Sequence, residues 1–172
     1  MGKIRPGLRL SVVQEWRQDE GFPGNWESIR RTVLFRDGYT CYYCGFTSAK
    51  YMHVHHKAGK HYDNSPDNLI TLCPFCHSCL HIGHAGANRM GSLLLLYQEI
   101  EQAKINRTLL EGASFDVFTT VREKLPVEKD FGPDGLIELA NEILHENFRP
   151  DGKFLFFPDY RKYDIVKYLV SR

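Results

Sequence analysis

A hydrophobic run long enough to cross a bilayer is absent from this sequence. The longest uninterrupted apolar run, residues 93–97, is far shorter than the roughly 18 residues that a membrane helix requires. The first residues also lack the apolar stretch that a secretory signal peptide carries. These absences predict an intracellular protein of the cytoplasm that does not insert into membranes.

A strong net charge is missing as well, because 22 Lys and Arg oppose 21 Asp and Glu and leave +1. Affinity for nucleic acid comes mainly from basic side chains on phosphates, so a protein that only binds DNA would usually be more basic. Residues 1–90 contain 11 Lys and Arg against 7 Asp and Glu, whereas residues 91–172 contain 11 against 14. We therefore expect any anion-binding face to be N-terminal, although chance asymmetry explains the difference equally well.

Internal repeats and low-complexity tracts are absent too. A chain of 172 residues with 42% hydrophobic residues can bury one core, so we expect one domain, or one domain with an appendage. We divide the sequence after its glycine-rich stretch into an N-terminal region, residues 1–92, and a C-terminal region, residues 93–172.

The cysteine count does not suit a disulfide framework. Five cysteines, an odd number, lie within 39 residues of a chain that we expect in a reducing compartment. Four of them form two CxxC pairs, Cys41 with Cys44 and Cys73 with Cys76, and each tight turn can present two thiolates to one ion. Structural zinc takes four ligands, so the two pairs predict a closed structural zinc site. The fifth, Cys79, fits a small buried hydrophobic residue.

Hydrophobic periodicity and turn residues predict the elements around these cysteines. The N-terminal region is expected to contain a helix at 26–37, a zinc turn at 40–46, strands at 50–56 and 68–73, a helix at 74–82 and a glycine-rich loop at 83–91. The C-terminal region is expected to be mainly helical, with helices at 97–110, 115–125, 135–147 and 160–171. The fold class is therefore α+β.

Histidines and an asparagine are interleaved with the zinc pairs. His77 and His81 are four residues apart on the expected helix, so their imidazoles share one face. His55 and His56 are adjacent on the expected strand and point to opposite sides, so one can bind a metal while the other faces a substrate. A lone histidine is usually a surface residue or a satisfied core residue. Four of them together with Asn68 indicate a functional site.

The combined motifs resemble the HNH endonucleases of the ββα-metal fold. They are VHH at residues 54–56, NL at 68–69 and LCPFCHSCLH at 72–81. In that family a His-His or Asp-His pair ends the first strand, an Asn lies in the loop and a CxxCHxxxH helix follows, and many members carry the same zinc. The resemblance covers about residues 35–85. It implies a zinc-stapled ββα-metal core with a mainly α-helical C-terminal extension.

The resemblance also implies a role for each motif residue. A catalytic divalent cation, Mg²⁺ or similar, would be bound by His55, His77 and His81. His56 would be the general base, and Asn68 would hold the loop and orient His56. The activity would be hydrolysis of DNA phosphodiester bonds to leave 5′-phosphate and 3′-hydroxyl ends. The candidate DNA contacts are the basic residues near the motif: Lys57, Lys60, Arg30 and Arg31.

A second resemblance competes with the first. RDGYTCYYCGF at residues 36–46, NLITLCPFC at 68–76 and the run at 81–106 are similar to the zinc-binding component of Dot/Icm-type secretion coupling complexes, known as IcmJ or DotN. That family has an HNH-like zinc scaffold without the catalytic histidines and serves as an adaptor. The present sequence departs from it by keeping those histidines: His55, His56, His77 and His81. The alternative function is therefore a non-catalytic scaffold whose acidic C-terminal region docks a protein partner.

Overall fold

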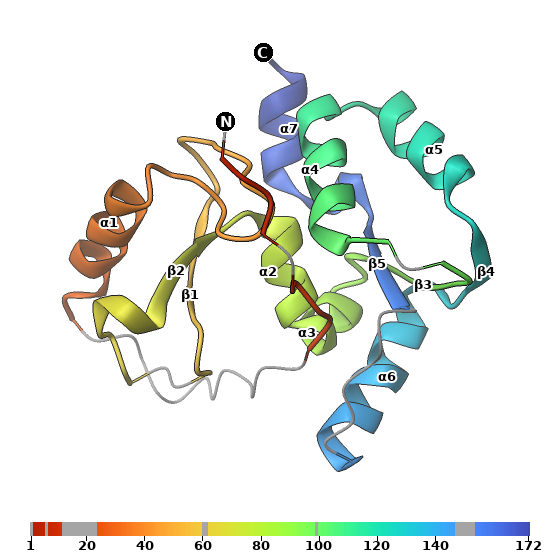
Figure 1. Cartoon of the computed structure of the whole chain (residues 1–172), viewed down its shortest axis with the longest axis horizontal. Coiled ribbons are helices and arrows are strands. Elements are labelled where there is room, and N and C mark those ends of the chain that lie inside the picture. The colour runs from red at the N-terminus through yellow and green to blue at the C-terminus, as the bar shows by residue number, and fades with distance from the viewer. Residues whose placement is uncertain (1, 6, 12–23, 60–61, 99, 147–153) are drawn as a thin grey trace.

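The N-terminal region contains a two-stranded antiparallel hairpin flanked by helices (Figure 1). The structure is a computed structural model, and it describes residues 2–5, 7–11, 24–59, 62–98, 100–146 and 154–172. In chain order the elements of this region are α1 (Trp26–Arg36), β1 (His53–His56), the 3-10 turn η1 (Pro66–Asn68), β2 (Leu69–Leu72), α2 (Pro74–Leu80) and α3 (Ile82–Ala87).

The hairpin pairs β1, which carries His55 and His56, with a fully buried strand. Strand β2, with the sequence LITL, is buried along its whole length, and β1 pairs with it so that His55 lies opposite Ile70 and His56 opposite Leu69. Arg36, at the end of α1, donates to the carbonyl oxygens of Pro66 at 2.7 Å and Leu69 at 2.8 Å. These bonds fasten α1 to β2 beside the loop between the strands.

Helix α2 begins at a cysteine and carries two of the motif histidines. Cys73 is its N-cap, with Sγ accepting a hydrogen bond from the Cys76 amide at 3.4 Å, and Pro74 occupies the first turn, where its missing N–H is not needed. His77 lies on the helix and His81 is its C-cap. The expected helix at residues 74–82 is therefore confirmed.

The C-terminal region combines helices with a three-stranded antiparallel sheet of order β4-β3-β5 (Figure 1). Its elements are β3 (Gly91–Leu96), α4 (Gln102–Gly112), α5 (Phe115–Lys124), β4 (Val127–Asp130), α6 (Gly132–Glu146), β5 (Phe154–Pro158), the 3-10 turn η2 (Tyr160–Lys162) and α7 (Asp164–Val170). The α+β class and the four helices expected in this region are confirmed. The sheet was not expected from the sequence.

The expected glycine-rich loop at residues 83–91 is wrong, because residues 82–87 form α3. Gly86 is buried against α6, and a Cβ atom placed on it would lie 2.9 Å from Cγ1 of Ile137 and 3.0 Å from Cβ of Leu136. Glycine is therefore required for close contact between two helices rather than for a flexible loop.

One hydrophobic core joins the two regions. Leu72 and Phe75 from the hairpin and α2 belong to the same buried cluster as Leu109, Leu136 and Phe156 from the C-terminal region. Figure 1 shows α2 and α3 lying between the hairpin and the C-terminal sheet. Side chains from both regions pack together in this core. The boundary after residue 92 therefore stays a prediction from the sequence. Within the part of the chain that the structure describes, no helix is both long and apolar enough to span a membrane.

Candidate metal centres

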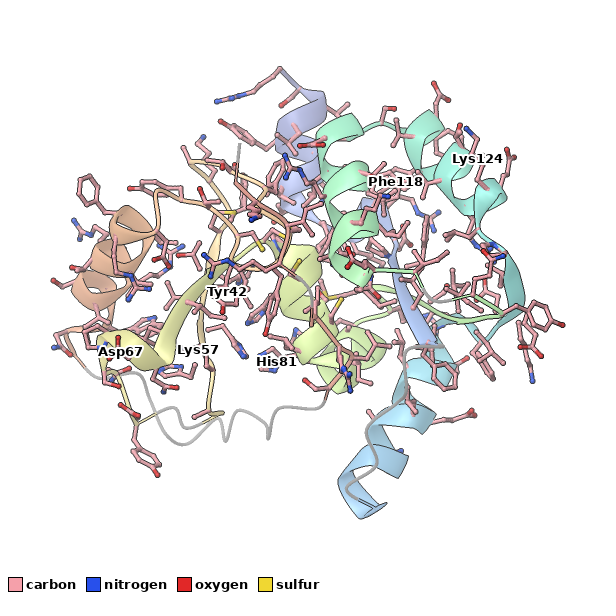
Figure 2. The ribbon with its side chains drawn as sticks, viewed as in Figure 1. Tyr42, Lys57, Asp67, His81, Phe118 and Lys124 are labelled. Carbon is pink, nitrogen blue, oxygen red and sulfur yellow. The ribbon has the colours of Figure 1, made fainter. Side chains whose placement is uncertain are left out.

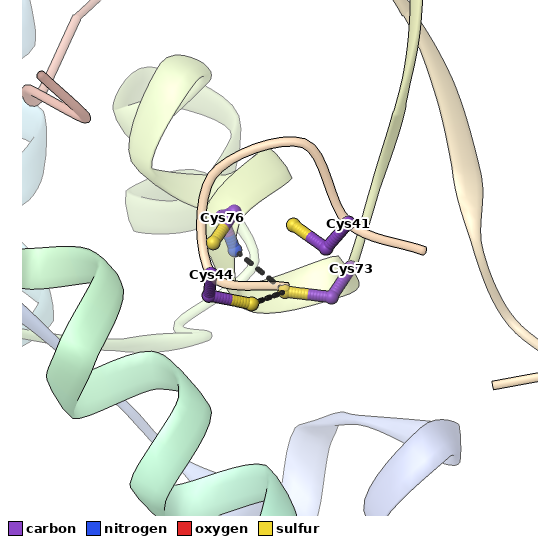
Figure 3. Close-up of side chains that lie close together, drawn as sticks. All are labelled: Cys41, Cys44, Cys73 and Cys76. Carbon is purple, nitrogen blue, oxygen red and sulfur yellow. Dashed lines mark hydrogen bonds between the residues drawn. The ribbon is translucent and has the colours of Figure 1, made fainter. Parts of the chain in front are cut away.

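The four cysteines of the two CxxC pairs converge on one buried point (Figure 3). Cys41 and Cys44 come from the turn after α1, and Cys73 and Cys76 come from the start of α2. All four Sγ atoms lie within 4.8 Å of one another, and Cys44 Sγ is 3.6 Å from Cys73 Sγ. A tetrahedral zinc with bonds of about 2.3 Å places its sulfur ligands about 3.8 Å apart. The four cysteines are therefore arranged to bind a metal, and their soft thiolate ligands suit zinc.

Ionisation within this four-cysteine centre reflects its burial. Burial raises the pKa of Cys73 and Cys76 well above the ordinary thiol value. Burial acts in the same direction on Cys41, but hydrogen bonds from the other three thiols outweigh it and lower the pKa of Cys41. A bound dication would stabilise the thiolate form of the cysteines that hold it.

A buried amide pair connects the four-cysteine centre to the C-terminal sheet. Asn106 of α4 directs Nδ2 toward Cys76 Sγ at 3.4 Å and Cys79 Sγ at 3.6 Å. Gln102, one turn earlier, donates to Asn106 Oδ1 at 2.8 Å and bonds both the N–H and the C=O of Phe156 in β5. Cys79 is fully buried, and burial raises its pKa to about 12, which agrees with its expected role as a core residue.

Replacing the amide that contacts the thiolate is expected to weaken the zinc site. Asn106→Leu removes the N–H donor to Cys76 while keeping a side chain of similar volume, so zinc affinity should fall about 10- to 100-fold. Competition against a colorimetric zinc chelator measures this affinity. Lys104→Leu, an exposed substitution on the same helix, is the control and should leave affinity unchanged. Equal zinc affinities for wild type and Asn106→Leu would contradict the outer-sphere role.

A second cluster is formed by His55, His77 and His81. Alternation along β1 turns His55 toward α2, and one nitrogen from each imidazole lies within 4.8 Å of the others. His81 Nε2 is 3.2 Å from His55 Nδ1. Two nitrogens that each bind one ion at about 2.1 Å lie about 3.0–3.4 Å apart, so the spacing fits ligands of a common metal. The structure therefore brings together the three histidines that the motif singles out.

The protonation state of the cluster also suits a metal. Burial, reinforced by the surrounding imidazoles, holds the pKa of His77 well below its ordinary value. His77 is therefore neutral at neutral pH, which is the form that binds metal ions. The neighbouring His53 stacks on His77 with ring centroids 4.6 Å apart and planes 9° from parallel.

Sequence reasoning missed His53 as a neighbour that stacks on the cluster. The sequence does contain an indication of this neighbour. His53 lies two residues before His55, and alternate residues of a strand share one face. Desolvation, followed by the charge of Arg30, lowers the pKa of His53. His53 is exposed, and its ring covers one face of His77.

His56 points to the other side of β1, as expected for adjacent strand residues. Its ring stacks on Trp26 of α1, with centroids 5.5 Å apart and planes 18° from parallel, and Nε2 lies 2.9 Å from Asn64 Oδ1. Asn68 closes the loop after β1: its Oδ1 accepts from the Ala58 amide at 2.9 Å and its Nδ2 donates to the Asp63 carbonyl at 2.8 Å.

A cavity of about 470 Å³ opens beside the histidine cluster. Its walls include Trp26 and Arg30 of α1, and residues 162–165, which run from the end of η2 into the first turn of α7, line it as well. The C-terminal region therefore supplies part of the site, including Lys162, which sequence reasoning did not select. No local pattern could indicate this contribution, because it depends on how the C-terminal chain folds back over the core.

The four basic residues expected to contact DNA fall in different places. Arg30 lines the cavity, with Nη2 donating to the Met52 carbonyl at 2.9 Å. Arg31 is exposed and its Nε lies 3.7 Å from Glu27 Oε1. Lys57 is exposed directly after β1, on the side of the molecule opposite Lys124 (Figure 2). Lys60 lies outside the described residues.

Comparisons with known proteins agree with this geometry. Residues 41–82 match the family model described as HNH endonuclease. The chain is 31% identical over 97 residues to the type 4 apparatus protein DotN of Legionella pneumophila, an alignment that covers 49% of this chain and 45% of DotN. It is 38% identical over 64 residues to the Zorya protein ZorE of Escherichia coli, covering 36% of this chain and 17% of ZorE.

The aligned segment thus spans less than half of either relative. The family match begins at Cys41 and extends one residue beyond His81, so it contains all four zinc-type cysteines and the whole histidine cluster. Residues 41–82 of this chain form an HNH domain with a four-cysteine metal site.

Proposed function

We propose that this protein is an HNH-type, metal-dependent endonuclease that hydrolyses DNA phosphodiester bonds, within a larger assembly. The observation that carries the proposal is that adjacent histidines on opposite sides of β1 have different partners. His55 joins two other histidines in a metal-type cluster on one side, while His56 is held on the other side by Trp26 and Asn64. An inert scaffold has no need for this arrangement.

The cation of the histidine cluster would be held by His55, His77 and His81. When bound, it would neutralise negative charge on the scissile phosphate and on the leaving oxygen. Three imidazole nitrogens favour a transition metal such as Mn²⁺, Ni²⁺ or Zn²⁺, whereas the Mg²⁺ expected from the family resemblance prefers oxygen ligands. We therefore expect activity with transition-metal ions to exceed activity with Mg²⁺.

His56 would act as the general base. It would remove a proton from a water molecule whose oxygen then forms a bond to phosphorus, while the bond from phosphorus to the 3′ oxygen breaks. The leaving oxygen would take a proton from solvent, giving a 3′-hydroxyl and a 5′-phosphate. Asn68 would keep the loop after β1 closed, which holds the backbone just beyond His56 in place.

DNA binding would use basic residues around the cavity. Arg30 and Lys162 line it, and Lys57, Lys60 and Arg31 are candidates for contacts farther along the backbone. Each contact with a phosphate adds affinity that falls with salt concentration. A net charge of only +1 predicts weak binding by the isolated chain, which is consistent with action inside an assembly.

The proposal is tested by incubating zinc-loaded protein with supercoiled plasmid and Mn²⁺, Ni²⁺ or Mg²⁺ in separate reactions. We expect conversion to open-circular DNA that requires the added ion, with the fastest conversion in Mn²⁺ or Ni²⁺. The folded state of the protein is checked by circular dichroism in the same buffers. A folded, zinc-loaded protein that cuts plasmid with none of these ions would exclude the nuclease function.

A second candidate is a non-catalytic zinc scaffold in a type IV secretion or conjugation complex. It is favoured by the similarity to DotN, which extends over 49% of the chain, and by the acidic C-terminal region available for a protein partner. Metal analysis separates the two candidates, since a scaffold requires one zinc per chain whereas the nuclease binds a second ion. Recovery of a stable protein partner from native cells would favour the scaffold.

A further inference from the structure

An aromatic and basic surface adjoins the cavity beside the histidine cluster. Tyr51, two residues before β1, lines this cavity and is 44% exposed. Its ring lies against the ring of Tyr168 on α7, with centroids 5.7 Å apart. Two cations lie over the ring of Tyr168, with Lys50 Nζ 4.9 Å and Arg172 Cζ 4.5 Å from its centroid. We call these four residues, which come from two distant parts of the chain, the tyrosine surface.

The backbone at Tyr51 lies in the left-handed region, with φ at +61°. This region is unfavourable for a bulky residue, and such residues concentrate at functional sites. Among the described non-glycine residues, Tyr39, Arg89 and Ala113 also have positive φ, but none of these three lines the cavity. The chain therefore places a large aromatic ring at the cavity wall, at a position where the backbone conformation favours glycine.

Charge at the cavity and at the tyrosine surface favours an anionic ligand. The charged residues that line the cavity are Arg30, Lys162 and Asp164. The Asp164 carboxylate lies 2.9 Å from Lys167 Nζ, which offsets its negative charge. Lys50 and Arg172 extend the positive charge over Tyr168. A ligand that has both aromatic faces and phosphate groups fits this combination, because rings stack on tyrosine while phosphates contact the cations.

The ring of Tyr51 can stack only on a base whose face is uncovered. In a DNA duplex each base is stacked between its neighbours and presents only its edges in the grooves. Stacking on a protein side chain therefore requires an unpaired strand or a base that has left the helix. We propose that the tyrosine surface binds an unpaired strand of DNA, with a base stacked on Tyr51 and phosphates contacting Lys50 and Arg172.

This surface would bring the strand to the histidine cluster, because Tyr51 and all three histidines of the cluster line the same cavity. Single-stranded or locally unpaired DNA is then the substrate class of the site. That consequence rests on the proposed nuclease function, whereas binding of the strand does not.

Binding is measured by fluorescence anisotropy with a labelled oligothymidylate and with the same strand annealed to its complement. The zinc-loaded full chain is used without any added divalent ion, so that cleavage does not interfere. We expect tighter binding to the single strand. Tyr51→Leu should weaken single-strand binding about 5- to 100-fold by removing the stacked ring, whereas Tyr51→Phe should bind as wild type does. Equal affinities for the two DNAs, or wild-type affinity in Tyr51→Leu, would overturn the proposal.

Two further substitutions separate stacking from charge. Tyr97→Leu is the matched control, because Tyr97 is 78% exposed but does not line the cavity, and this variant should bind as wild type does. Lys50→Gln should reduce the slope of log affinity against log salt by about 0.7, the value for one phosphate contact on a single strand. An unchanged slope in both Lys50→Gln and Arg172→Gln would overturn the proposal.

Photocrosslinking tests the contact in the wild-type chain and does not depend on how any variant folds. A single strand that carries 5-iodouracil couples on irradiation to an aromatic ring stacked on it. We expect mass spectrometry to find the strand attached to the peptide that contains Tyr51. Attachment to other peptides, with none at Tyr51, would overturn the proposal.

Failure of this proposal is distinguishable from failure of the nuclease function. A chain that binds single strands through Tyr51 but cuts no plasmid would support the tyrosine surface while excluding the nuclease. A chain that cuts plasmid without any preference for single strands would overturn the tyrosine surface alone. Where both hold, supercoiled plasmid, which exposes unpaired segments, should be nicked faster than the same plasmid after relaxation. Equal nicking rates for the two forms would overturn the substrate class.

Discussion

Removing the metal from the four-cysteine centre, by a strong chelator or by Cys73→Ser, should unfold the HNH domain and weaken the whole molecule. The four thiols are at most 1% exposed and belong to the same hydrophobic cluster as the C-terminal core. Structural zinc supplies about 10–16 kcal/mol of apparent binding free energy. That amount equals or exceeds the roughly 5–15 kcal/mol that stabilises a typical domain.

Circular dichroism and thermal unfolding provide the measurement. We expect a loss of helical signal and of the cooperative transition when the metal is removed, with recovery when zinc is returned. Cys79→Ala is the matched control: this cysteine is equally buried but lies outside the ligand set, so the variant should keep its zinc and lose only about 1 kcal/mol. A chelated protein with an undiminished transition would contradict a structural metal.

The second large effect is expected at the histidines. His56→Ala should lower kcat for plasmid nicking by about 10²- to 10⁴-fold, the usual contribution of a general base, while the chain keeps both ions. His77→Ala should abolish nicking by a different route, because the histidine cluster loses one of its three ligands and its ion with it. Metal analysis by mass spectrometry should then find two ions per chain in wild type and His56→Ala but one in His77→Ala.

His84→Ala is the control for these variants. His84 lies on α3, is exposed and is outside the cluster that could bind a metal, so nicking and metal content should both match wild type. Nicking that persists unchanged in His56→Ala would exclude the proposed base. A second ion retained in both His77→Ala and His55→Ala would exclude the histidine cluster as its site.

The two centres should not behave independently, because α2 belongs to both. The helix begins with the zinc-type ligands Cys73 and Cys76 and continues to His77 and His81. A zinc ion bound by Cys73 and Cys76 would fix the first turn of the helix, and the helix carries two of the three imidazoles that face β1. Loss of the structural zinc is therefore expected to release the second ion as well, whereas loss of the second ion should leave the zinc in place.

Local sequence carried enough information to predict the HNH domain. Two CxxC pairs predicted the shared metal site because a tight turn places both of its thiolates on one ion. Adjacent histidines in a strand had to point to opposite faces, and the structure places His55 and His56 in that way. These outcomes depend on backbone geometry over a few residues, which is why the sequence alone could predict them.

Contacts between distant segments decided the rest. The run at 93–96 became the central strand β3 because β4 and β5, from later in the chain, pair with both of its edges. Gly86 belongs to a helix because α6 packs against it, and Lys162 lines the cavity because the chain after β5 returns to the histidine cluster. Asn64 and Asn106 gained their partners in the same way, one through loop closure and the other across the core. The sequence by itself therefore determined which residues could bind metal. Only the tertiary structure decided which side chains surround, position and enclose those residues. These contacts join residues that are far apart in the sequence, so the periodicity of a single helix or strand cannot predict them.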